Sequence, residues 1–154
     1  MTFDTLPYRL GVGIVLLNAQ DQVFVGRRID TLSDVWQMPQ GGIDEQEAPE
    51  KAALRELYEE TGISSARILA ETRNWHHYDL PDRIIPNMWG GKYRGQKQKW
   101  YLMRFSGDES EVKLTLHEPE FSAYRWVDST QLSDLAAPFK RKLYEDVVKE
   151  FFHV

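Results

Sequence analysis

The chain has 154 residues, 42% of them hydrophobic and 28% charged, which is the composition of a globular protein, and we expect one domain over residues 1–154. It contains no cysteine, which excludes disulfides and thiol chemistry and fits a reducing cytoplasm, where we expect the protein to act. The net charge of −5 argues against a uniformly basic nucleic-acid surface. No apolar run approaches ~20 residues and no signal-peptide pattern opens the chain, so we expect no membrane partner.

The first part of the chain predicts short strands. Residues 10–17 form an apolar run rich in branched side chains, which is typical of a buried strand. Residues 23–25 return as its hairpin partner after a turn at 18–20. We expect a polar loop over residues 29–35 and a short extended piece at 36–38 that a proline closes.

Residues 49–61 predict a helix. Pro49 suits its first turn, because no intrahelical hydrogen bond needs the missing N–H. Gly62 suits the left-handed position just past its end. Between them lies a run of good helix formers.

Three carboxylates share one narrow stripe of this helix, because Glu56, Glu59 and Glu60 lie three and four positions apart at about 100° per residue. Their repulsion is only partly offset by Arg55, which can pair with Glu59. One interpretation is an ordinary solvated helix face. The other, which we favour, is a site for Mg²⁺ or Mn²⁺, since both prefer carboxylate oxygens.

The other faces of the helix carry smaller and apolar side chains. Leu54, Leu57 and Tyr58 point away from the carboxylates, and we expect them to face the core. Ala52 and Ala53 flank the carboxylate stripe one turn earlier, where we expect their small side chains to leave room for a ligand.

The second half of the chain predicts further strands and a closing helix. We expect one or two strands over residues 66–78, a long loop over 80–95, strands over 97–105 and 124–127, a short helix from Asp128–Ser129 to 135, and a helix over 138–152 with Leu143, Val147, Val148 and Phe151 on its inner face. Strands, a central helix, more strands and a last helix indicate an α/β or α+β sandwich.

Charge is unevenly spread along the chain. Residues 44–60 hold seven acids against two bases, whereas residues 83–104 hold six bases and no acid. A metal-binding acidic region beside a cationic stretch suits a polyanionic substrate. The alternative is that these bases lie on a solvated loop and strand.

Residues 41–63 follow the spacing G-x5-E-x7-R-E-U-x-E-E-x-G-U, where U is apolar. This spacing resembles the signature of the Nudix hydrolases. The resemblance implies an α/β/α sandwich with a mixed sheet, a catalytic loop–helix–loop, and hydrolysis of phosphoanhydride bonds with Mg²⁺ or Mn²⁺. It also implies that the backbone carbonyl of Gly41 or a neighbour joins the metal ligands. Glu47 precedes the helix and is therefore a weaker candidate ligand, and the alternative is an orienting role through Arg55.

Further segments along nearly the whole chain resemble the RNA 5′-pyrophosphohydrolases and dinucleoside polyphosphate hydrolases of this family, most specifically residues 36–43 and 95–100. One departure is Leu10-Gly11, where the family usually has Pro-Asn, and it bears on how Arg9 is positioned.

The resemblance implies an enzyme that removes pyrophosphate from 5′-triphosphorylated RNA and leaves a 5′-monophosphate. The alternative is asymmetric hydrolysis of diadenosine tetraphosphate to ATP and AMP, and a diphosphatase for small nucleotides is a further one. A binding module without catalysis would be expected to lack a glutamate of the signature, and this chain has them all.

The same resemblance implies the site residues. The candidate catalytic residues are Glu56, Glu59, Glu60 and Glu120, and these four with Gly41 are the candidate metal ligands. Glu120 is either a metal ligand or the base that takes a proton from the attacking water. The candidate substrate contacts are Arg9, Arg27, Arg28, Gln40, Tyr78, Lys97, Lys99 and Phe139.

These substrate contacts have physical reasons and open alternatives. Guanidinium groups match phosphate oxygens, although Arg27 and Arg28 suit surface ion pairs equally well. Lys97 and Lys99 share one face of a strand, so both can face the substrate. Phe139 is a candidate for stacking on a base, or else a core residue.

Overall fold

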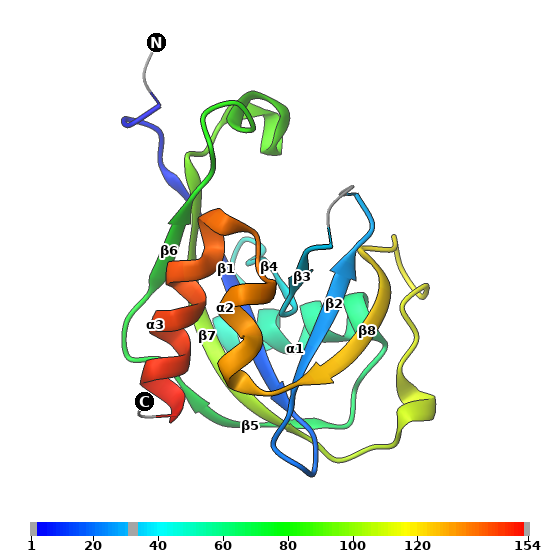
Figure 1. Cartoon of the computed structure of the whole chain (residues 1–154). Helices are drawn as coiled ribbons and strands as arrows, with labels where there is room; N and C mark the ends of the chain where they lie inside the picture. Colours follow the sequence, from blue (N-terminus) through cyan, green and yellow to red (C-terminus); the bar gives the residue numbers. More distant parts are fainter. Residues whose placement is uncertain (1–2, 31–33, 153–154) are drawn as a thin grey trace.

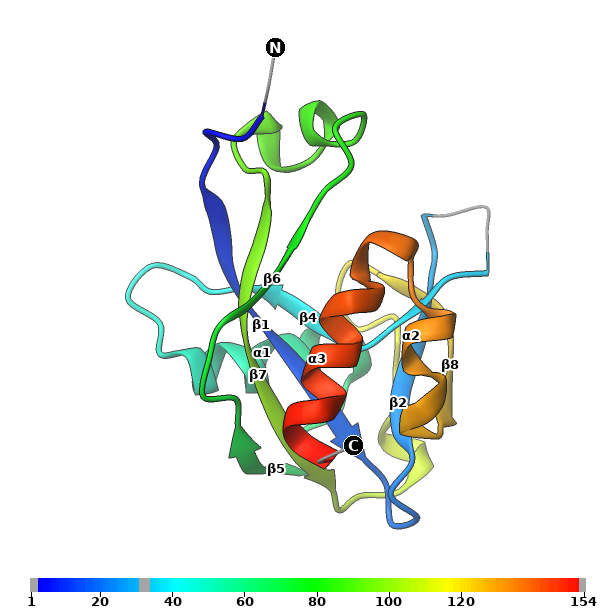
Figure 2. The ribbon, with the colours of Figure 1, turned by 60° about the vertical axis from the view of Figure 1, so that its left-hand side comes forward.

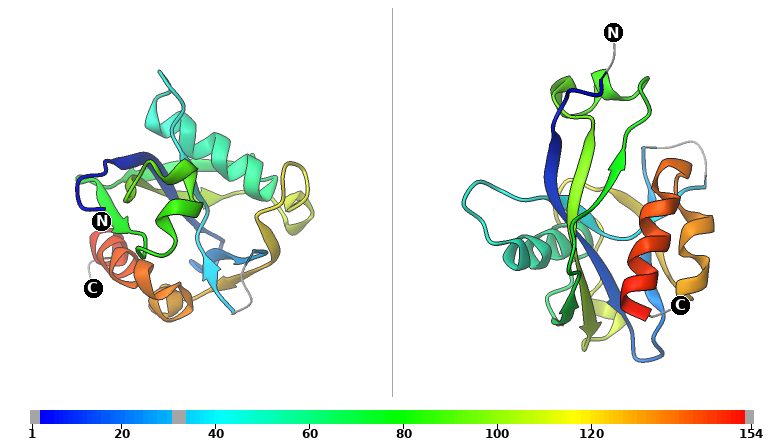
Figure 3. Two further views of the ribbon diagram at one scale, coloured as in Figure 1. Left: turned by 90° about the horizontal axis from the view of Figure 1, so that it is seen from above. Right: turned by 90° about the vertical axis from the view of Figure 1, so that its left-hand side faces the viewer.

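The protein is a three-layer sandwich in which a mixed sheet separates one helix from two others (Figure 1). The computed structural model describes residues 3–30 and 34–152, so residues 31–33 of the predicted polar loop lie outside the described residues. Seen from above, α1 covers one face of the sheet and α2 and α3 cover the other (Figure 3). The predicted α/β sandwich with a mixed sheet is confirmed.

The elements follow one another along the chain as predicted, with short additions. The strands are β1 (Tyr8–Leu17), β2 (Val23–Arg28), β3 (Trp36–Gln37), β4 (Gln40–Gly42), β5 (Ala66–Glu71), β6 (His76–Asp79), β7 (Gly95–Phe105) and β8 (Phe121–Val127). The α-helices are α1 (Pro49–Thr61), α2 (Leu132–Leu135) and α3 (Arg141–Phe152). Short 3₁₀ turns are η1 (Ile85–Asn87), η2 (Trp89–Gly91), η3 (Glu109–Glu111), η4 (Ser129–Gln131) and η5 (Pro138–Lys140).

Strand β1 is the centre of the sheet. It pairs in parallel with β7 from Tyr8 opposite Gly95 to Leu17 opposite Arg104, and antiparallel with β2 and β4. The remaining pairs, β2 with β3 and β8 and β7 with β5 and β6, are antiparallel. Because β4 is held against β1 and leads into α1, the sheet fixes where the loop before α1 lies (Figure 2).

Alternation along the central strands divides the core into two clusters. Towards α1, Ile14, Leu16 and Met103 pack with Ala53 and Leu57. The opposite cluster, towards α2 and α3, holds Val15, Val25, Trp100, Leu132, Leu143, Tyr144 and Val147. The helix cover on both faces explains why the inner strands read as continuous apolar runs.

Helix α1 begins and ends where the sequence predicts. Pro49 lies in the first turn, and Gly62 has φ = 77° and donates its N–H to the Tyr58 carbonyl oxygen at 2.8 Å. This is the left-handed backbone conformation at the end of a helix. Residues with a side chain rarely adopt it, which is why glycine is needed here.

The predicted orientation of α1 is wrong in part. Leu57 is buried as expected, but Leu54 and Tyr58 are 41% and 44% exposed. Ala52 and Ala53 are fully buried in the core and leave no room for a ligand. The buried face of the helix thus holds Ala52, Ala53 and Leu57 together with Glu60, one of the three carboxylates.

The last predicted elements are confirmed with adjusted bounds. Asp128 forms a capping box with Gln131, and the segment that Pro138 opens begins as a 3₁₀ turn before α3. Leu143, Val147 and Val148 are buried as predicted. Tyr144 is also fully buried, and its hydroxyl accepts the Met38 N–H at 3.0 Å. No helix among the described residues is long and apolar enough to cross a membrane.

Gly13 of β1 carries a packing constraint that predicts a stability effect. A Cβ on Gly13 would overlap the indole ring of Trp100, which is fully buried. Gly13→Ala is therefore expected to lower the free energy of unfolding by about 1–3 kcal/mol, the usual cost of overpacking. Urea denaturation measures this, with Leu10→Ala as control, since Leu10 is on the same strand but 52% exposed. Equal losses in the two variants would contradict the prediction.

Candidate active site

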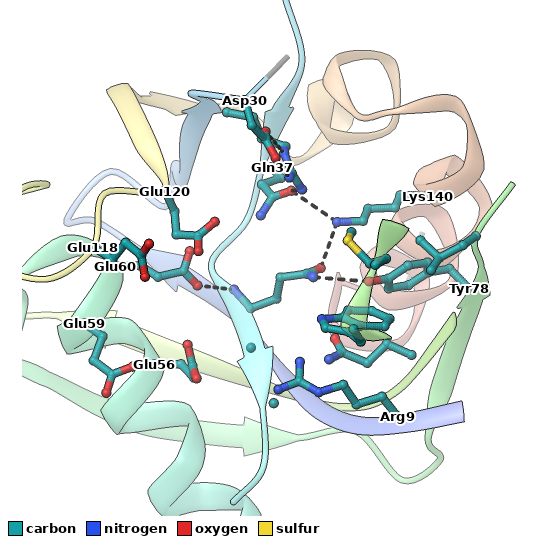
Figure 4. Close-up of a pocket in the computed structure, with 18 of the residues that line it drawn as sticks. Arg9, Asp30, Gln37, Glu56, Glu59, Glu60, Tyr78, Glu118, Glu120 and Lys140 are labelled. Atoms are coloured by element: carbon teal, nitrogen blue, oxygen red, sulfur yellow. Dashed lines mark hydrogen bonds and ion pairs between the residues drawn. The ribbon is translucent and has the colours of Figure 1, made fainter. Parts of the chain in front are cut away.

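A cavity of about 570 Å³ opens between the loop before α1, the start of β1 and the turn η5. One wall carries carboxylates and the opposite wall carries basic, amide and aromatic groups (Figure 4). Ten of the residues singled out from the sequence line it: Arg9, Arg28, Gln40, Gly41, Glu56, Glu59, Glu60, Tyr78, Glu120 and Phe139. The cavity thus brings together residues from seven separate parts of the chain.

The acidic wall is the carboxylate stripe of α1 laid against β4. Glu60 is 5% exposed, and its Oε1 accepts the backbone N–H of Gln40 at 3.0 Å. Glu56 lies directly against Gly41, where any Cβ would overlap its carboxylate. Gly41 is therefore required for close approach of backbone and carboxylate, and its peptide lies beside the acidic stripe.

Burial changes the acidity of two of these carboxyls. The pKa of Glu56 is raised to about 7, chiefly by burial and further by the charge of Glu59, against the lowering effect of Arg55. The pKa of Glu60 is raised well above its usual value by burial and then by the charge of Glu56. Both shifts arise because a buried carboxylate loses the hydration that stabilises its negative charge in water.

Arg55 holds the loop and the helix together at the edge of this wall. Its guanidinium donates to both carboxylate oxygens of Glu47 at 2.8 and 2.9 Å and to the Gly42 carbonyl oxygen at 2.9 Å. Another nitrogen lies 2.9 Å from Glu56 and 3.2 Å from Glu59. The hydrogen bonds from Arg55 lower the pKa of Glu47 to about 2. The contacts of Glu47 are thus those of an orienting group, as the sequence suggested.

The oxygen atoms on this wall are of the chemical type that binds a hard divalent cation. Glu56, Glu59 and Glu60 offer carboxylate oxygens, and the Gly41 backbone lies beside them. Among the described residues no three acidic or histidine side chains converge closely enough to hold a metal ion as they stand. In this arrangement Arg55 engages both Glu56 and Glu59.

The opposite wall is centred on Lys140, a residue that the sequence analysis did not assign to the site. It is 3% exposed, and its Nζ donates to Gln37 Oε1 and Gln40 Oε1, both at 3.1 Å. Burial, and then the charge of Arg28, lower the pKa of Lys140 to about 7. The only signal for Lys140 in the sequence is its position next to Phe139, because nothing in a helix pattern predicts a buried lysine.

Aromatic side chains complete this wall. Phe139 lies 5.8 Å from the Tyr78 ring, measured between centroids, and the Tyr78 hydroxyl accepts from Gln40 Nε2 at 3.4 Å. On the same side of the cavity, the Arg9 guanidinium lies over the Trp89 ring, 5.2 Å from its centroid. Aromatic surface therefore borders two of the basic groups of the cavity, Arg9 and Lys140.

Three predicted substrate contacts do not line the cavity: Arg27, Lys97 and Lys99. Arg27 points outward and pairs with Asp34 at 3.3 Å. Lys97 and Lys99 do share one face of β7, but it is the face of Tyr101 and Met103, towards α1. Their neighbour Gln96 lies on the other face and lines the cavity instead. The parallel register with β1 decides this, and the sequence pattern does not reveal it.

Glu120 reaches the cavity from the segment before β8. Figure 4 shows its carboxylate opposite Glu60, with Glu118 beside them. The backbone carbonyl of Glu120 accepts the N–H of Ile29, which ties this segment to the end of β2. Asp30, Glu118 and His117 also line the cavity and were not predicted.

Comparisons with known proteins agree with this arrangement. The profile of the NUDIX domain matches residues 7–147. The chain is similar to an RNA pyrophosphohydrolase of Novosphingobium aromaticivorans, with 56% identity over 97% of this chain and 95% of that protein. RNA pyrophosphohydrolases of Sphingopyxis alaskensis and Rickettsia canadensis are 54% and 51% identical, over 96% and 95% of this chain and 95% and 91% of theirs.

Solved structures share the fold at low identity. The E. coli dihydroneopterin triphosphate pyrophosphohydrolase superposes with a TM-score of 0.71 at 19% identity, over 92% of this chain and 97% of that one. A C. elegans Ap4A hydrolase gives 0.66 at 16% identity, over 95% and 99%. At such identities the likeness concerns the fold alone.

The raised pKa of Glu56 predicts a pH effect on the metal-free protein. A carboxyl whose pKa rises from 4.5 to about 7 on folding is protonated in the folded state and ionised in the unfolded state between these values. Stability therefore falls as pH rises through this window. In EDTA, Glu56→Gln is expected to raise Tm by several degrees at pH 8 and by much less at pH 5.

Differential scanning calorimetry of both proteins at the two pH values checks this. Glu50→Gln, on the exposed start of α1, serves as control and is expected to show no pH-dependent difference. An equal Tm difference between Glu56→Gln and the unaltered protein at pH 5 and pH 8 would contradict the assignment.

Proposed function

The chain belongs to the Nudix family and is a pyrophosphohydrolase, and from this we propose that it removes pyrophosphate from the 5′-triphosphate end of RNA and leaves a 5′-monophosphate. The observation that carries the proposal is the cavity itself, which sets a carboxylate wall against a wall of Arg9, Arg28 and Lys140. A bound polyphosphate would contact cationic side chains on one wall. The other wall carries carboxylates, the kind of group that binds divalent cations. The choice of RNA as the substrate is supported by similar proteins that are named RNA pyrophosphohydrolases, one of them 56% identical to this chain.

We assign the metal ligands to the acidic wall. Glu56, Glu59, Glu60 and the Gly41 carbonyl would hold Mg²⁺ or Mn²⁺. When bound, the ion neutralises phosphate charge and lowers the pKa of a coordinated water. Its charge would also return the buried carboxyls Glu56 and Glu60 to their ionised forms.

The remaining groups bind and orient the substrate and move a proton. Arg9 and Arg28 border the cavity, where guanidinium donors suit phosphate oxygens. Gln40 is held by Lys140 and Tyr78, so its side chain is fixed in position between the two walls. Glu120, opposite Glu60, accepts the proton of the attacking water, and the phosphoanhydride bond between the α- and β-phosphates breaks.

The base of the first or second nucleotide would find aromatic surface at Phe139. This ring packs beside Tyr78 and lies at the edge of the cavity. Stacking of a base on an aromatic ring contributes about 1–3 kcal/mol and tolerates any base. Such a contact fits an enzyme that must accept many different RNA ends.

A second candidate substrate is a dinucleoside polyphosphate, which would be hydrolysed asymmetrically, diadenosine tetraphosphate giving ATP and AMP. The observation in its favour is that Trp89 and Phe139 line the same cavity from different segments. A dinucleotide needs two aromatic surfaces, one for each base. The phosphate chemistry would be the same for both substrates.

The carboxylate assignment predicts a loss of turnover without a loss of fold. Glu59→Gln or Glu60→Gln removes one negative charge from the metal site and is expected to lower kcat by at least about a hundredfold. Gln at position 60 can still accept the Gln40 N–H, and a neutral group relieves the burial of charge, so Tm should not fall. Steady-state kinetics with Mg²⁺ measure the loss of turnover, and isothermal titration calorimetry measures the binding of Mg²⁺ and Mn²⁺.

Glu50→Gln provides the matched control, since Glu50 lies on the same helix outside the cavity. Full turnover in Glu59→Gln and Glu60→Gln would remove the basis for the metal assignment, and so would a folded protein that takes up neither ion in the presence of a nucleotide analogue.

The substrate is decided by comparing kcat/KM on 5′-triphosphorylated RNA and on diadenosine tetraphosphate. We expect the RNA value to be higher at equal Mg²⁺. Ionic strength must be matched, because binding of a polyanion weakens steeply with salt. A ratio that strongly favours the dinucleotide would reverse the order of the two proposals and leave the reaction class intact.

A further inference from the structure

Three buried side chains of β7 form a chain of hydrogen bonds that leads from the core to the cavity. Trp100 Nε1 donates to Gln98 Oε1 at 3.0 Å, and Gln98 Nε2 donates to Gln96 Oε1 at 2.6 Å. Trp100 and Gln98 are fully buried and Gln96 is 1% exposed. Because the three residues alternate along one strand, their side chains lie on the same face of the sheet.

The direction of these hydrogen bonds follows from chemistry. An indole N–H can only donate, so Gln98 must turn its amide oxygen toward Trp100. The amide nitrogen of Gln98 then faces Gln96, which must accept the hydrogen bond with its amide oxygen. The remaining group, Gln96 Nε2, is left at the end of the chain as a donor. The orientation of the Gln96 amide is thus set by the indole of Trp100, four residues further along the strand, which can only donate.

This last donor has no partner within the described part of the protein. Gln96 Nε2 is the one buried side-chain nitrogen or oxygen there without a hydrogen bond. Buried amide groups are almost always paired, and an unpaired one lowers stability, so each exception calls for an explanation. Gln96 is also among the residues that line the cavity, which indicates where its partner would come from.

The surroundings of Gln96 show what kind of partner fits. A Cβ added to Gly11 would lie 2.6 Å from Gln96 Cδ and 2.6 Å from the Gly41 carbonyl oxygen, so the amide lies close to the backbone of β4. In the parallel register Gln96 is also the partner of Arg9. An oxygen that arrives between the acidic stripe and Arg9 would therefore meet the Gln96 amide as well.

We propose that Gln96 donates a hydrogen bond from Nε2 to a phosphate oxygen of the bound polyphosphate, and that Trp100 and Gln98 are positioning residues that keep this donor turned toward the cavity. The proposal rests on the proposed function, because it takes a polyphosphate as the ligand. The neutral amide adds a directed contact without adding charge beside Glu56.

Kinetics of paired variants test the chain of contacts. Gln96→Met removes the donor, and Gln98→Met keeps the size of the side chain but frees the Gln96 amide to turn. Each is expected to raise KM for 5′-triphosphorylated RNA about tenfold, the scale of one hydrogen bond. We expect kcat to change less than about twofold, because the contact exists in the bound substrate and the transition state alike.

The double variant separates positioning from a merely structural role. If Gln98 acts through Gln96, adding Gln98→Met to Gln96→Met raises KM no further. Gln22→Met, an exposed site far from the cavity, is the matched control and should leave KM unchanged. Independent, multiplicative effects of the two changes, or unaltered KM in Gln96→Met, would overturn the proposal.

A binding measurement on the unaltered protein needs no turnover. In ¹⁵N–¹H spectra, the side-chain amide signal of Gln96, identified by its absence in Gln96→Met, should shift when tripolyphosphate and Mg²⁺ are added together. It should stay in place with Mg²⁺ alone. A shift with Mg²⁺ alone would assign the contact to the metal shell, and no shift in either case would exclude it; both results overturn the proposal.

The two lines of failure can be told apart. If tripolyphosphate shifts the Gln96 signal but the protein does not hydrolyse triphosphorylated RNA, the proposed substrate is wrong and the Gln96 contact holds. If RNA is hydrolysed while neither the signal nor KM responds, the proposed function holds and the role of Gln96 is wrong.

Discussion

The packing of α1 on the sheet is the constraint from which the site follows. Ala52 and Ala53 are fully buried beneath the helix, and Glu60 is buried on the same face, with Glu56 beside it. Burial raises the pKa values of Glu56 and Glu60, and the charges of Glu59 and Glu56, respectively, raise them further. The helix is therefore held in a state that a divalent cation would relieve.

The opposite wall also contains a buried charged group, but there the charge is positive. Burial, and then the charge of Arg28, lower the pKa of Lys140 to about 7, although its ammonium donates to two amide oxygens. One residue joins the two walls, because Gln40 donates its backbone N–H to Glu60 and accepts from Lys140 with its side chain. A phosphate chain between the walls would stabilise both, since it brings negative charge to Lys140 and shares a cation with the glutamates.

The sequence predicts the elements well and the facing of side chains less well. Pro49 and Gly62 define α1 because the ends of a helix depend on local backbone chemistry. The predicted burial of Leu54 and Tyr58 is wrong, because the sequence does not show whether another layer of the fold covers an apolar residue at the edge of a buried helix face. Lys97 and Gln96 lie on opposite faces of β7, and only the register with β1 decides which one borders the cavity. Lys140 is missed because its burial depends on partners about a hundred residues away.

Fold and chemistry are coupled through the centre of the sheet. Gly13 leaves room for the Trp100 ring, whose indole nitrogen begins the hydrogen bonds that end at Gln96, and Gly11 leaves room for the Gln96 amide beside β4. Residue 11 is a glycine, so no side chain there can pair with the unpaired amide nitrogen of Gln96. A donor that the fold leaves unpaired lowers stability in the free protein and gains a partner when an oxygen binds. The same arrangement therefore lowers the stability of the empty site and favours the bound state.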